Sequence, residues 1–317
     1  MGLRPGERVV IVTDRPEIEV GTALKKSAEK ITGASNVKLF VLEDLTTRPI
    51  TSLPVAIADA VPDANVTFWA AQSLPGELVV RRQFTTLAKK YARHGHMPNV
   101  TPVLMEQGMN SDYDRVYELT HKIFDLVRTA RNISVSNRFG VKIEAAFDPS
   151  WRWVAADGRY HDKGRWGNLP EGETYTAPKV VNGKLVTHLL GDWFSEKYGN
   201  FPEALSLQID SSVIDLRSVN CDNEGLKKDL LKYFTTDPNS IRASEFALPT
   251  NPELMMMPTI GNLLQDEKSR VHIAFGDPYQ DDTGAPWRCP THIDMLLEEC
   301  DLEVDGRAIM KKGNYVV

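Results

Sequence analysis

The stretch VVIVTD, residues 9–14, is a continuous apolar run that ends in Thr13 and Asp14. Such a run is typical of a β-strand buried on both faces of a parallel sheet. The pattern then alternates between helical and strand segments. We expect, in order, a helix to Ile31 with Gly33 as its C-cap, a strand over Lys38–Leu42, a helix over Leu53–Ala60, a strand over Val66–Ala71, a helix over Glu77–Arg93, a strand over Val100–Glu106 and a helix from Ser111 to about Arg131. This alternation indicates βαβ units and a mostly parallel sheet.

The first half of the chain has no phosphate-binding loop. The sequence contains neither G-x-G-x-x-G after the first strand nor G-x-x-x-x-G-K-[ST] anywhere. We therefore interpret residues 1–135 as a Rossmann-like α/β scaffold domain, whose long helices could also mediate dimerisation. His94 and His96 have a spacing that would suit a metal, but no carboxylate is adjacent and Gly95 separates them. We interpret these histidines as a solvated helix end.

From about residue 132 the pattern changes to short strands and turns. KVVNGKLV around Asn182-Gly183 and DLEVDGRAI around Asp305-Gly306 predict type I′ hairpins, because both central positions need positive φ. One helix is expected near Glu224–Phe234. The prediction is an α/β N-terminal domain with a mostly parallel sheet, followed over residues 136–317 by an α+β, metal-binding catalytic domain rich in antiparallel strands.

Composition narrows the class of protein. The 317 residues are 42% hydrophobic and 25% charged, as in an ordinary globular protein. A net charge of −6 without a long basic run argues against a nucleic-acid partner. The three cysteines form no CxxC, which argues against a disulfide framework or a thiolate zinc site. No apolar run approaches the ~20 residues that cross a membrane, and no signal-peptide core follows Met1, so we expect a cytoplasmic protein with no membrane partner.

Four residues that can bind metal lie in short apolar runs of the second half. They are Glu245 in ASEFALP, His272 in RVHIAFGDPY, and His292 with Asp294 in PTHIDMLL. Each run predicts a buried strand that carries a polar side chain at its end. Two imidazoles and two carboxylates from three strands could hold one divalent metal, and a fifth oxygen ligand would let them hold two.

A candidate for the fifth ligand lies in NLPEGETYTAP, residues 168–178. This stretch carries Glu171 and Glu173 between glycine and proline residues and leads into a strand. Taken alone it would be an ordinary polar turn. A single histidine beside a carboxylate would likewise be an ordinary core histidine, so the prediction of a metal site depends on the complete ordered set.

That ordered set, PEGETYTAP, SEFALP, DEKSRVHIAFGDPY and THIDMLL, resembles the thermophilic aminopeptidases of peptidase family M29. The similarity covers about residues 165–317. The resemblance implies a homodimer and a site for two divalent ions (zinc, cobalt or manganese) with ligands Glu173, Glu245, His272, His292 and Asp294. It also implies that Tyr279 is a catalytic tyrosine. The N-terminal domain is shorter than is usual for the family and the segment between His272 and His292 is compressed, which bears on substrate access.

The resemblance implies an aminopeptidase-like hydrolase that cleaves an N-terminal residue, or a related amide, from a peptide or small amide substrate with a metal-bridged hydroxide. We expect Glu245 to act as a ligand and to handle protons, and Glu173 to bridge the ions. Tyr279 would donate a hydrogen bond to the developing oxyanion. Asp277 would orient His272. Asp266 and Glu267 are expected on a solvated turn.

Two alternatives remain open on sequence grounds. The same fold is similar to that of 2,5-dihydroxypyridine dioxygenase, which implies a mononuclear Fe(II) site with two histidines and one carboxylate, or a specialised small-molecule amidohydrolase. Carboxylates at both Glu173 and Glu245 favour the dinuclear hydrolase. A non-enzymatic protein of the same fold is the third hypothesis, although such a protein has no physical reason to hold five ligands.

Overall fold

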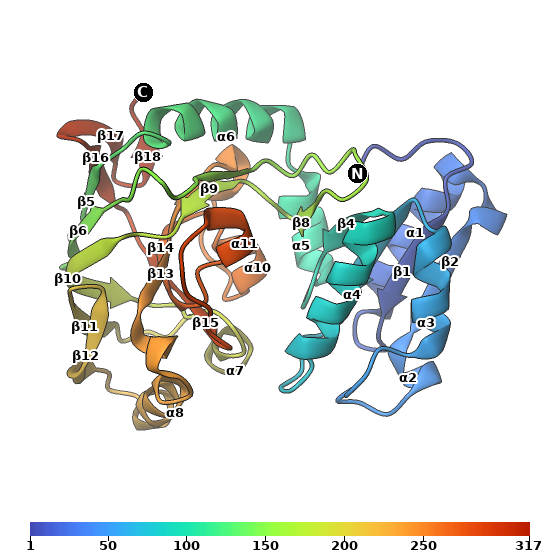
Figure 1. Cartoon of the computed structure of the whole chain (residues 1–317), viewed down its shortest axis with the longest axis horizontal. Helices are drawn as coiled ribbons and strands as arrows, with labels where there is room; N and C mark the ends of the chain where they lie inside the picture. The colour runs from blue at the N-terminus through green and yellow to red at the C-terminus, as the bar shows by residue number, and fades with distance from the viewer. The chain divides into compact units, whose positions relative to one another are not determined.

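A computed structural model describes every residue of the chain, Met1–Val317, and divides it into two compact units (Figure 1). The first unit comprises residues 1–113 and 158–171, and the second comprises residues 114–157 and 172–317. The sequence predicted a single boundary at residue 135. Helix α6 (Tyr113–Val127) groups instead with the second unit, because its Ile123 and Val127 pack into that unit's hydrophobic core.

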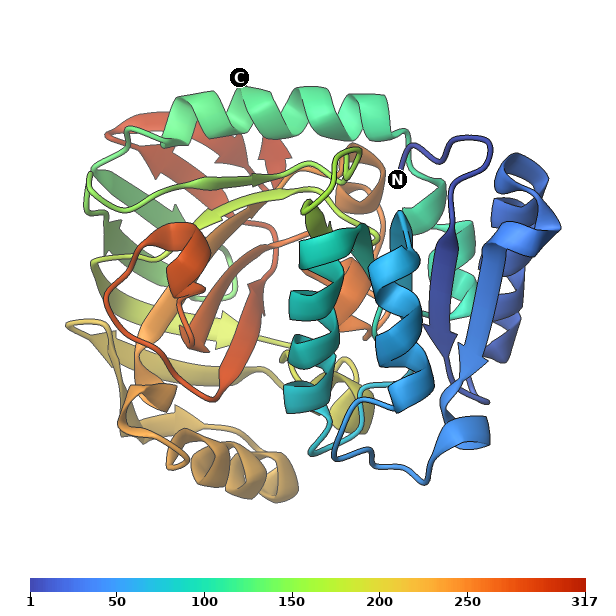
Figure 2. The same cartoon turned by 45° about the vertical axis from the view of Figure 1, so that its right-hand side comes forward.

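The first unit is built on a parallel sheet with strand order β2-β1-β3-β4-β8. Its strands are β1 (Val9–Thr13), β2 (Val37–Val41), β3 (Val66–Ala70), β4 (Arg93–His96) and β8 (Trp166–Asn168). Its helices are α1 (Ile18–Thr32), α2 (Leu42–Leu45), α3 (Val55–Ala60), α4 (Leu78–Tyr91) and α5 (Pro102–Glu106). Val10 and Val12 of β1 pack with residues of α3 and α4, and α1 covers the opposite face (Figure 2). The predicted α/β domain with a parallel sheet is confirmed.

Two local predictions for this unit are wrong. The predicted strand over Val100–Glu106 is helix α5, which Thr101 caps and a proline at the first helical position favours. His94 and His96, expected at a solvated helix end, lie instead in strand β4 between β3 and β8. Burial lowers the pKa of His94 to about 3 and also lowers that of His96. The helix ends earlier than predicted, since β4 begins directly after Ala92.

Buried ionic groups lie where β1 and β3 end. In a doubly wound sheet, ligands bind beyond the carboxyl ends of the strands where the strand order reverses, which here is between β1 and β3. The guanidinium of Arg48 pairs with Asp14, directly after β1, and with Glu77. Gln72, just beyond β3, donates its main-chain N–H to Asp14 over 2.7 Å. The side chains of this crevice are therefore paired with one another.

The second unit contains two antiparallel sheets that share one hydrophobic core. The first has the order β12-β11-β10-β6-β5-β16-β17-β18, with β5 (Asn132–Ser136), β6 (Lys142–Ala146), β10 (Val180–Thr187), β11 (Leu205–Asp210), β12 (Val213–Asn220), β16 (Asp301–Val304), β17 (Arg307–Lys311) and β18 (Asn314–Tyr315). The second has the order β15-β14-β13-β9-β7, with β7 (Val154–Ala156), β9 (Glu173–Thr176), β13 (Ala243–Pro249), β14 (Val271–Gly276) and β15 (His292–Leu297). The predicted antiparallel-rich second domain is confirmed.

The helices of this unit are mostly short, and the longest of them, α6, runs beside its strands. These are α6, α7 (Phe194–Tyr198), α8 (Glu224–Phe234), α9 (Pro252–Met255), α10 (Leu263–Asp266) and α11 (Gln280–Thr283) (Figure 1). The predicted helix near Glu224–Phe234 is confirmed as α8. None of the chain's helices combines the length and the apolar character needed to cross a membrane.

One of the two predicted hairpins is present. Asp305 and Gly306 have φ of 47° and 82° and connect β16 to β17, as a type I′ turn requires. The hairpin predicted at Asn182-Gly183 is wrong, because β10 continues through both residues. A Cβ on Gly183 would lie 2.0 Å from the carbonyl oxygen of Lys142, so this glycine permits the close approach of β6 rather than a turn.

Candidate metal centre

The candidate ligands lie on one face of the second sheet because side chains alternate along each strand. Phe246 of β13, Ile273 of β14 and Ile293 of β15 point into the hydrophobic core. Their neighbours along the chain, Glu245, His272 and both His292 and Asp294, therefore point to the opposite face. The alternating apolar and polar residues of HIDMLL and VHIAFG thus fix the direction of the candidate ligands.

Strand register brings these side chains together. Ala274 in the middle strand is paired with Glu245 on one side and with Asp294 on the other. The methyl group of Ala274 leaves space between the two carboxylates. Gly276 is paired with His292 in the same way. Small residues on β14 therefore separate the candidate ligands of β13 and β15.

The side chains form two groups of three ligand atoms, each group lying within 4.8 Å. In the first group, Nε2 of His272 lies 3.6 Å from Oε2 of Glu173 and 3.9 Å from Oε1 of Glu245. In the second group, Nε2 of His292 lies 3.2 Å from Oε2 of Glu245 and 3.4 Å from Oδ1 of Asp294. The structure therefore brings all five predicted residues to one place.

Glu245 belongs to both groups. Its Oε1 faces His272 and its Oε2 faces His292. A carboxylate that offers each oxygen to a different group has the geometry of a bridge. The sequence had predicted Glu173 as the bridge, and its Oε2 faces His272.

The other ring nitrogen of each histidine contacts a main-chain carbonyl. Nδ1 of His272 lies 3.2 Å from the carbonyl oxygen of Arg270, and Nδ1 of His292 lies 2.8 Å from that of Asp277. When Nδ1–H donates to the carbonyl, Nε2 is left with a lone pair directed at the carboxylates. Asp277 was expected to orient His272, and this is wrong, because its carbonyl contacts His292.

The carboxylate of Asp277 has a separate role. It accepts the main-chain N–H of Tyr279 over 2.9 Å and that of Cys289 over 3.3 Å. Tyr279 has φ of 49°, a left-handed conformation that a bulky aromatic residue rarely adopts. Asp277 thus stabilises the turn that contains Tyr279.

The ring of Tyr279 lies against the centre. Its centroid is 4.6 Å from that of His292 and 6.0 Å from that of Tyr175. Burial and the nearby charges of Glu245 and Asp294 raise the pKa of Tyr279 well above its ordinary value. The hydroxyl therefore stays protonated at neutral pH and is able to donate a hydrogen bond.

Negative charge dominates the electrostatics of the centre. Burial would lower the pKa of His292, but the carboxylates of Asp294 and Glu245 raise it well above the ordinary value. Burial would raise the pKa of Asp294, yet His292, His272 and Lys268 hold it at about 2. The carboxylates thus stabilise positive charge in this space, whether it is a proton on His292 or a cation.

Lys268 is a residue of the centre that the sequence analysis missed. Its side chain is 1% exposed, and Nζ lies 2.5 Å from Oε1 of Glu173 and 2.8 Å from Oε1 of Glu267. Glu173 therefore presents one oxygen to Lys268 and the other to His272. The position of Lys268 four residues before His272, in a stretch that carries the family resemblance, is the signal that could have identified it.

The solvated turn predicted for Asp266 and Glu267 is also wrong, because both residues are buried. The carboxylate of Asp266 accepts main-chain N–H groups from Ile260, Gly261 and Asn262. Burial nevertheless raises the pKa of Asp266 to about 6 and also raises that of Glu267. Asp266 organises the turn, and Glu267 pairs with Lys268.

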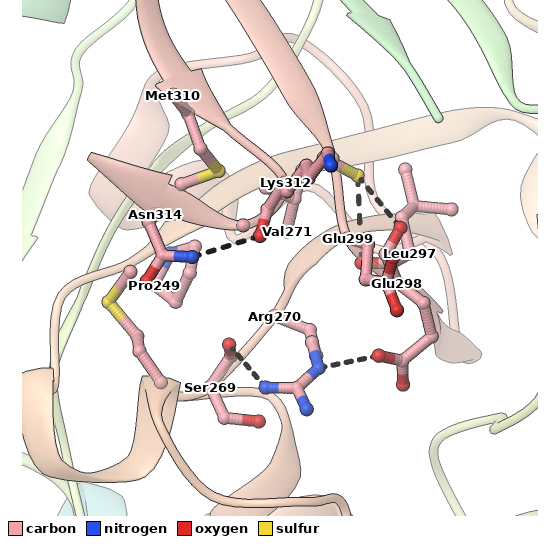
Figure 3. Close-up of a pocket in the computed structure, with 13 residues that line it drawn as sticks. Pro249, Ser269, Arg270, Val271, Leu297, Glu298, Glu299, Met310, Lys312 and Asn314 are labelled. Carbon is pink, nitrogen blue, oxygen red and sulfur yellow. Dashed lines mark hydrogen bonds and ion pairs between the residues drawn. The ribbon is translucent and has the colours of Figure 1, made fainter. Parts of the chain in front are cut away.

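A pocket that contains none of the candidate ligands lies beside the start of β14 (Figure 3). Arg270 lines it, and its guanidinium donates to Glu298 over 2.8 Å and to the carbonyls of Ser269 and Met257 over 3.0 Å. These bonds fix Arg270, whose own carbonyl contacts His272. The bonds of Arg270 therefore help to hold the carbonyl that contacts Nδ1 of His272.

Comparisons with known proteins show which proteins this chain is similar to. No protein-family model matches the chain. In sequence it is similar to 2,5-dihydroxypyridine 5,6-dioxygenase from Pseudomonas putida, with 24% identity over 199 residues. That match covers 60% of this chain and only 56% of the dioxygenase.

Two solved structures share the fold over nearly the whole chain. One is 2,5-dihydroxypyridine dioxygenase from Pseudomonas putida KT2440, with a TM-score of 0.71, 18% identity, and coverage of 98% of this chain and 92% of that one. The other is wild-type AmpT from Thermus thermophilus, with a TM-score of 0.73, 17% identity, and coverage of 99% and 95%. At these identities the matches establish the fold.

Proposed function

We propose that the chain is a metal-dependent hydrolase of the aminopeptidase type, which binds two divalent cations and cleaves an N-terminal residue from a peptide or a related small amide. The observation that carries this proposal is the geometry of Glu245, whose two oxygens face His272 and His292 separately. The fold shared with AmpT, an aminopeptidase of the M29 family that the sequence motifs resemble, supports it.

The donors fit divalent cations. Imidazole nitrogen and carboxylate oxygen are ligands that zinc, cobalt and manganese accept, and the donor groups lie in buried surroundings. One ion would be held by Glu173, Glu245 and His272. The other would be held by Glu245, His292 and Asp294. The contacts of both histidines through Nδ1 leave Nε2 directed at each position.

A pair of divalent cations, when bound, supplies a water of lowered pKa and polarises the scissile carbonyl. Glu245 is placed to accept a proton at a carboxylate oxygen. Tyr279 donates its hydroxyl proton in a hydrogen bond to the carbonyl oxygen as negative charge develops there, a contribution of about 3 kcal/mol in comparable oxyanion sites.

The test uses the purified chain, stripped of metal by a chelator and reloaded with zinc, cobalt or manganese. We expect metal-dependent release of the N-terminal residue from at least one member of a panel of aminoacyl anilides and dipeptides. The variant Glu245→Ala should be inactive with every metal. Absence of turnover with all three metals, or full turnover by Glu245→Ala, would contradict the proposal.

A second candidate function is Fe(II)-dependent ring cleavage. The sequence match to 2,5-dihydroxypyridine 5,6-dioxygenase, which covers 60% of the chain, favours it. His272, His292 and one carboxylate would then hold a single iron, as in other two-histidine, one-carboxylate sites. Oxygen consumption with iron and a hydroxypyridine would support this function. Anomalous scattering or elemental analysis showing one iron per chain would separate it from the hydrolase.

The homodimer implied by the family resemblance stays a prediction. Light scattering of the purified chain is the direct measurement, and a monomer at the concentration used for activity assays would contradict it.

A further inference from the structure

We propose that Lys268 is a built-in cation that makes the two metal positions unequal. The position formed by Glu245, His292 and Asp294 fills first, and the position formed by Glu173, Glu245 and His272 binds its ion more weakly. This inference rests on the two positions of the proposed function. It concerns the order and affinity of loading, which neither the family resemblance nor the fold comparison assigns.

We call the weaker position, formed by Glu173, Glu245 and His272, the first position, and the one formed by Glu245, His292 and Asp294 the second position. The ammonium group of Lys268 lies beside the first position. Its Nζ lies 2.5 Å from Oε1 of Glu173 and 2.8 Å from Oε1 of Glu267. Both carboxylates are almost fully buried, so the two ion pairs are shielded from water. Buried charges are retained when they are paired in this way, and removal of one partner leaves the other uncompensated.

Hydrogen bonds fix the turn that carries Lys268. The main-chain N–H of Lys268 donates to the carbonyl of Gln265, and that of Ser269 donates to the carbonyl of Asp266, both over 3.0 Å. The hydroxyl of Ser269 donates to the same carbonyl of Asp266 over 2.7 Å. The carboxylate of Asp266 in turn binds the main-chain N–H groups of residues 260–262. The main chain that carries the ammonium is therefore held in place beside the centre.

The two positions experience this charge differently. Glu173, a ligand of the first position, shares its carboxylate with the ammonium, so an ion bound there lies across one carboxylate from a like charge. In a buried site that repulsion is stronger than in water. Asp294, a ligand of the second position, faces Nε2 of His292 over 3.4 Å, and the charge of Lys268 acts on its pKa less than those of the two histidines. The ammonium, which contacts Glu173 directly, therefore acts more strongly on the first position than on the second.

The experiment is a titration of the metal-free full chain with Mn²⁺, followed by calorimetry, with bound metal counted by elemental analysis. The wild type should show two binding events with different dissociation constants. Asp294→Asn should lose the tight event, and Glu173→Gln should lose only the weak one. These two variants assign each event to its position without any measurement of activity.

Lys268→Met removes the ammonium and keeps an unbranched side chain. We expect its weak dissociation constant to fall by about tenfold or more, and the tight one to change by less than about threefold. Lys268→Gln, which is neutral but can still hydrogen-bond Glu173, should change in the same direction and provides a second variant if the methionine variant does not fold. Lys179→Met is the matched control, because Lys179 pairs on the surface with Asp148 over 2.9 Å.

The outcomes separate this inference from the proposed function. Two ions of equal affinity in the wild type, or a weak constant that neither Lys268 variant improves, would overturn the inference and leave the hydrolase proposal standing. One ion in the wild type and two in Lys268→Met would support the inference, because the ammonium would then exclude the second ion. One ion in both chains would contradict both proposals.

Discussion

Oε2 of Glu245 lies 3.2 Å from Nε2 of His292, although β14 separates the strands β13 and β15 that carry these residues. The contact is possible because Ala274 of β14 is in register with Glu245 and places only a methyl group between the outer strands. The other oxygen of Glu245 faces His272. Glu245 therefore belongs to both groups of candidate ligands, and Oδ1 of Asp294 also lies 3.9 Å from Nε2 of His272.

Replacement of this shared carboxylate should affect both metal positions. Glu245→Gln keeps the size of the side chain but exchanges an anionic oxygen for an amide nitrogen that cannot bind a cation. We expect both dissociation constants for Mn²⁺ to rise by more than about 100-fold, a larger effect than is usual for residues that only orient a ligand. Calorimetry on the metal-free chain measures both. Glu299→Gln, which alters a surface pair with Arg138, should bind like the wild type. Loss of one event alone would show that Glu245 is not shared.

The hydroxyl of Tyr279 is expected to contribute to the reaction and not to folding. Tyr279→Phe keeps the ring that packs against His292 at 4.6 Å and removes only the hydrogen-bond donor. We expect kcat to fall by about 100-fold with KM nearly unchanged, as for loss of one oxyanion donor. The melting temperature and the amount of bound metal should match the wild type. A variant with normal kcat would assign Tyr279 a packing role.

The face to which the candidate ligands point could be predicted from the sequence, because it depends on local alternation. In HIDMLL the residues at every second position are apolar and enter the core, so His292 and Asp294 had to share the other face. Residues 266–268 could not be placed in this way. Three charged residues before a strand are usually solvated. Lys268 is buried here because it pairs with Glu173, and this partner lies 95 positions earlier in the chain, where local sequence does not reveal it.

The same limit explains the errors in the fold. Asn182-Gly183 has the composition of a tight turn, but neighbouring strands β6 and β11 pair with Gly183 on both sides and extend β10 through it. His94 and His96 follow a helical stretch, yet β3 and β8 supply hydrogen-bonding partners that make this segment a strand. In both cases pairing between distant segments overrides the local preference.

Glu17 makes the stability of the chain depend on pH. Burial, assisted by the charge of Asp14, raises the pKa of Glu17 to about 7 from an ordinary value of 4.5. Between these values the folded chain holds a proton that the unfolded chain has lost, so the free energy of unfolding falls as the pH rises through about 7. We expect Glu17→Gln to raise the melting temperature at pH 8 by about 3 °C or more and to leave it almost unchanged at pH 4.

Scanning calorimetry at both values of pH checks this prediction. Glu19→Gln is the matched control, because Glu19 is an exposed residue of the same first turn of α1. An equal change at pH 4 and pH 8 would mean that Glu17 is ionised in the folded chain at pH 8 without cost.

Arg48 is expected to stabilise the first unit by compensating two buried carboxylates. Its side chain is 6% exposed, and those of its partners Asp14 and Glu77 are fully buried. Its guanidinium also donates to the carbonyl of Gln72 over 2.7 Å. Arg48→Met would leave both carboxylates without a counter-charge, which costs about 3–5 kcal/mol for a buried pair. By contrast, Arg15→Met removes an exposed pair with Asp44 and should cost less than about 1 kcal/mol.

Urea unfolding, followed by the fluorescence of the tryptophans, measures the difference between the two arginine variants. Adding Asp14→Asn and Glu77→Gln to Arg48→Met should recover most of the lost stability, because no buried charge then remains to be compensated. If Arg48→Met were as stable as Arg15→Met, water would have to reach the two carboxylates. The crevice beyond β1 and β3 would then be accessible to a ligand, and the interpretation of this unit as a scaffold would be wrong.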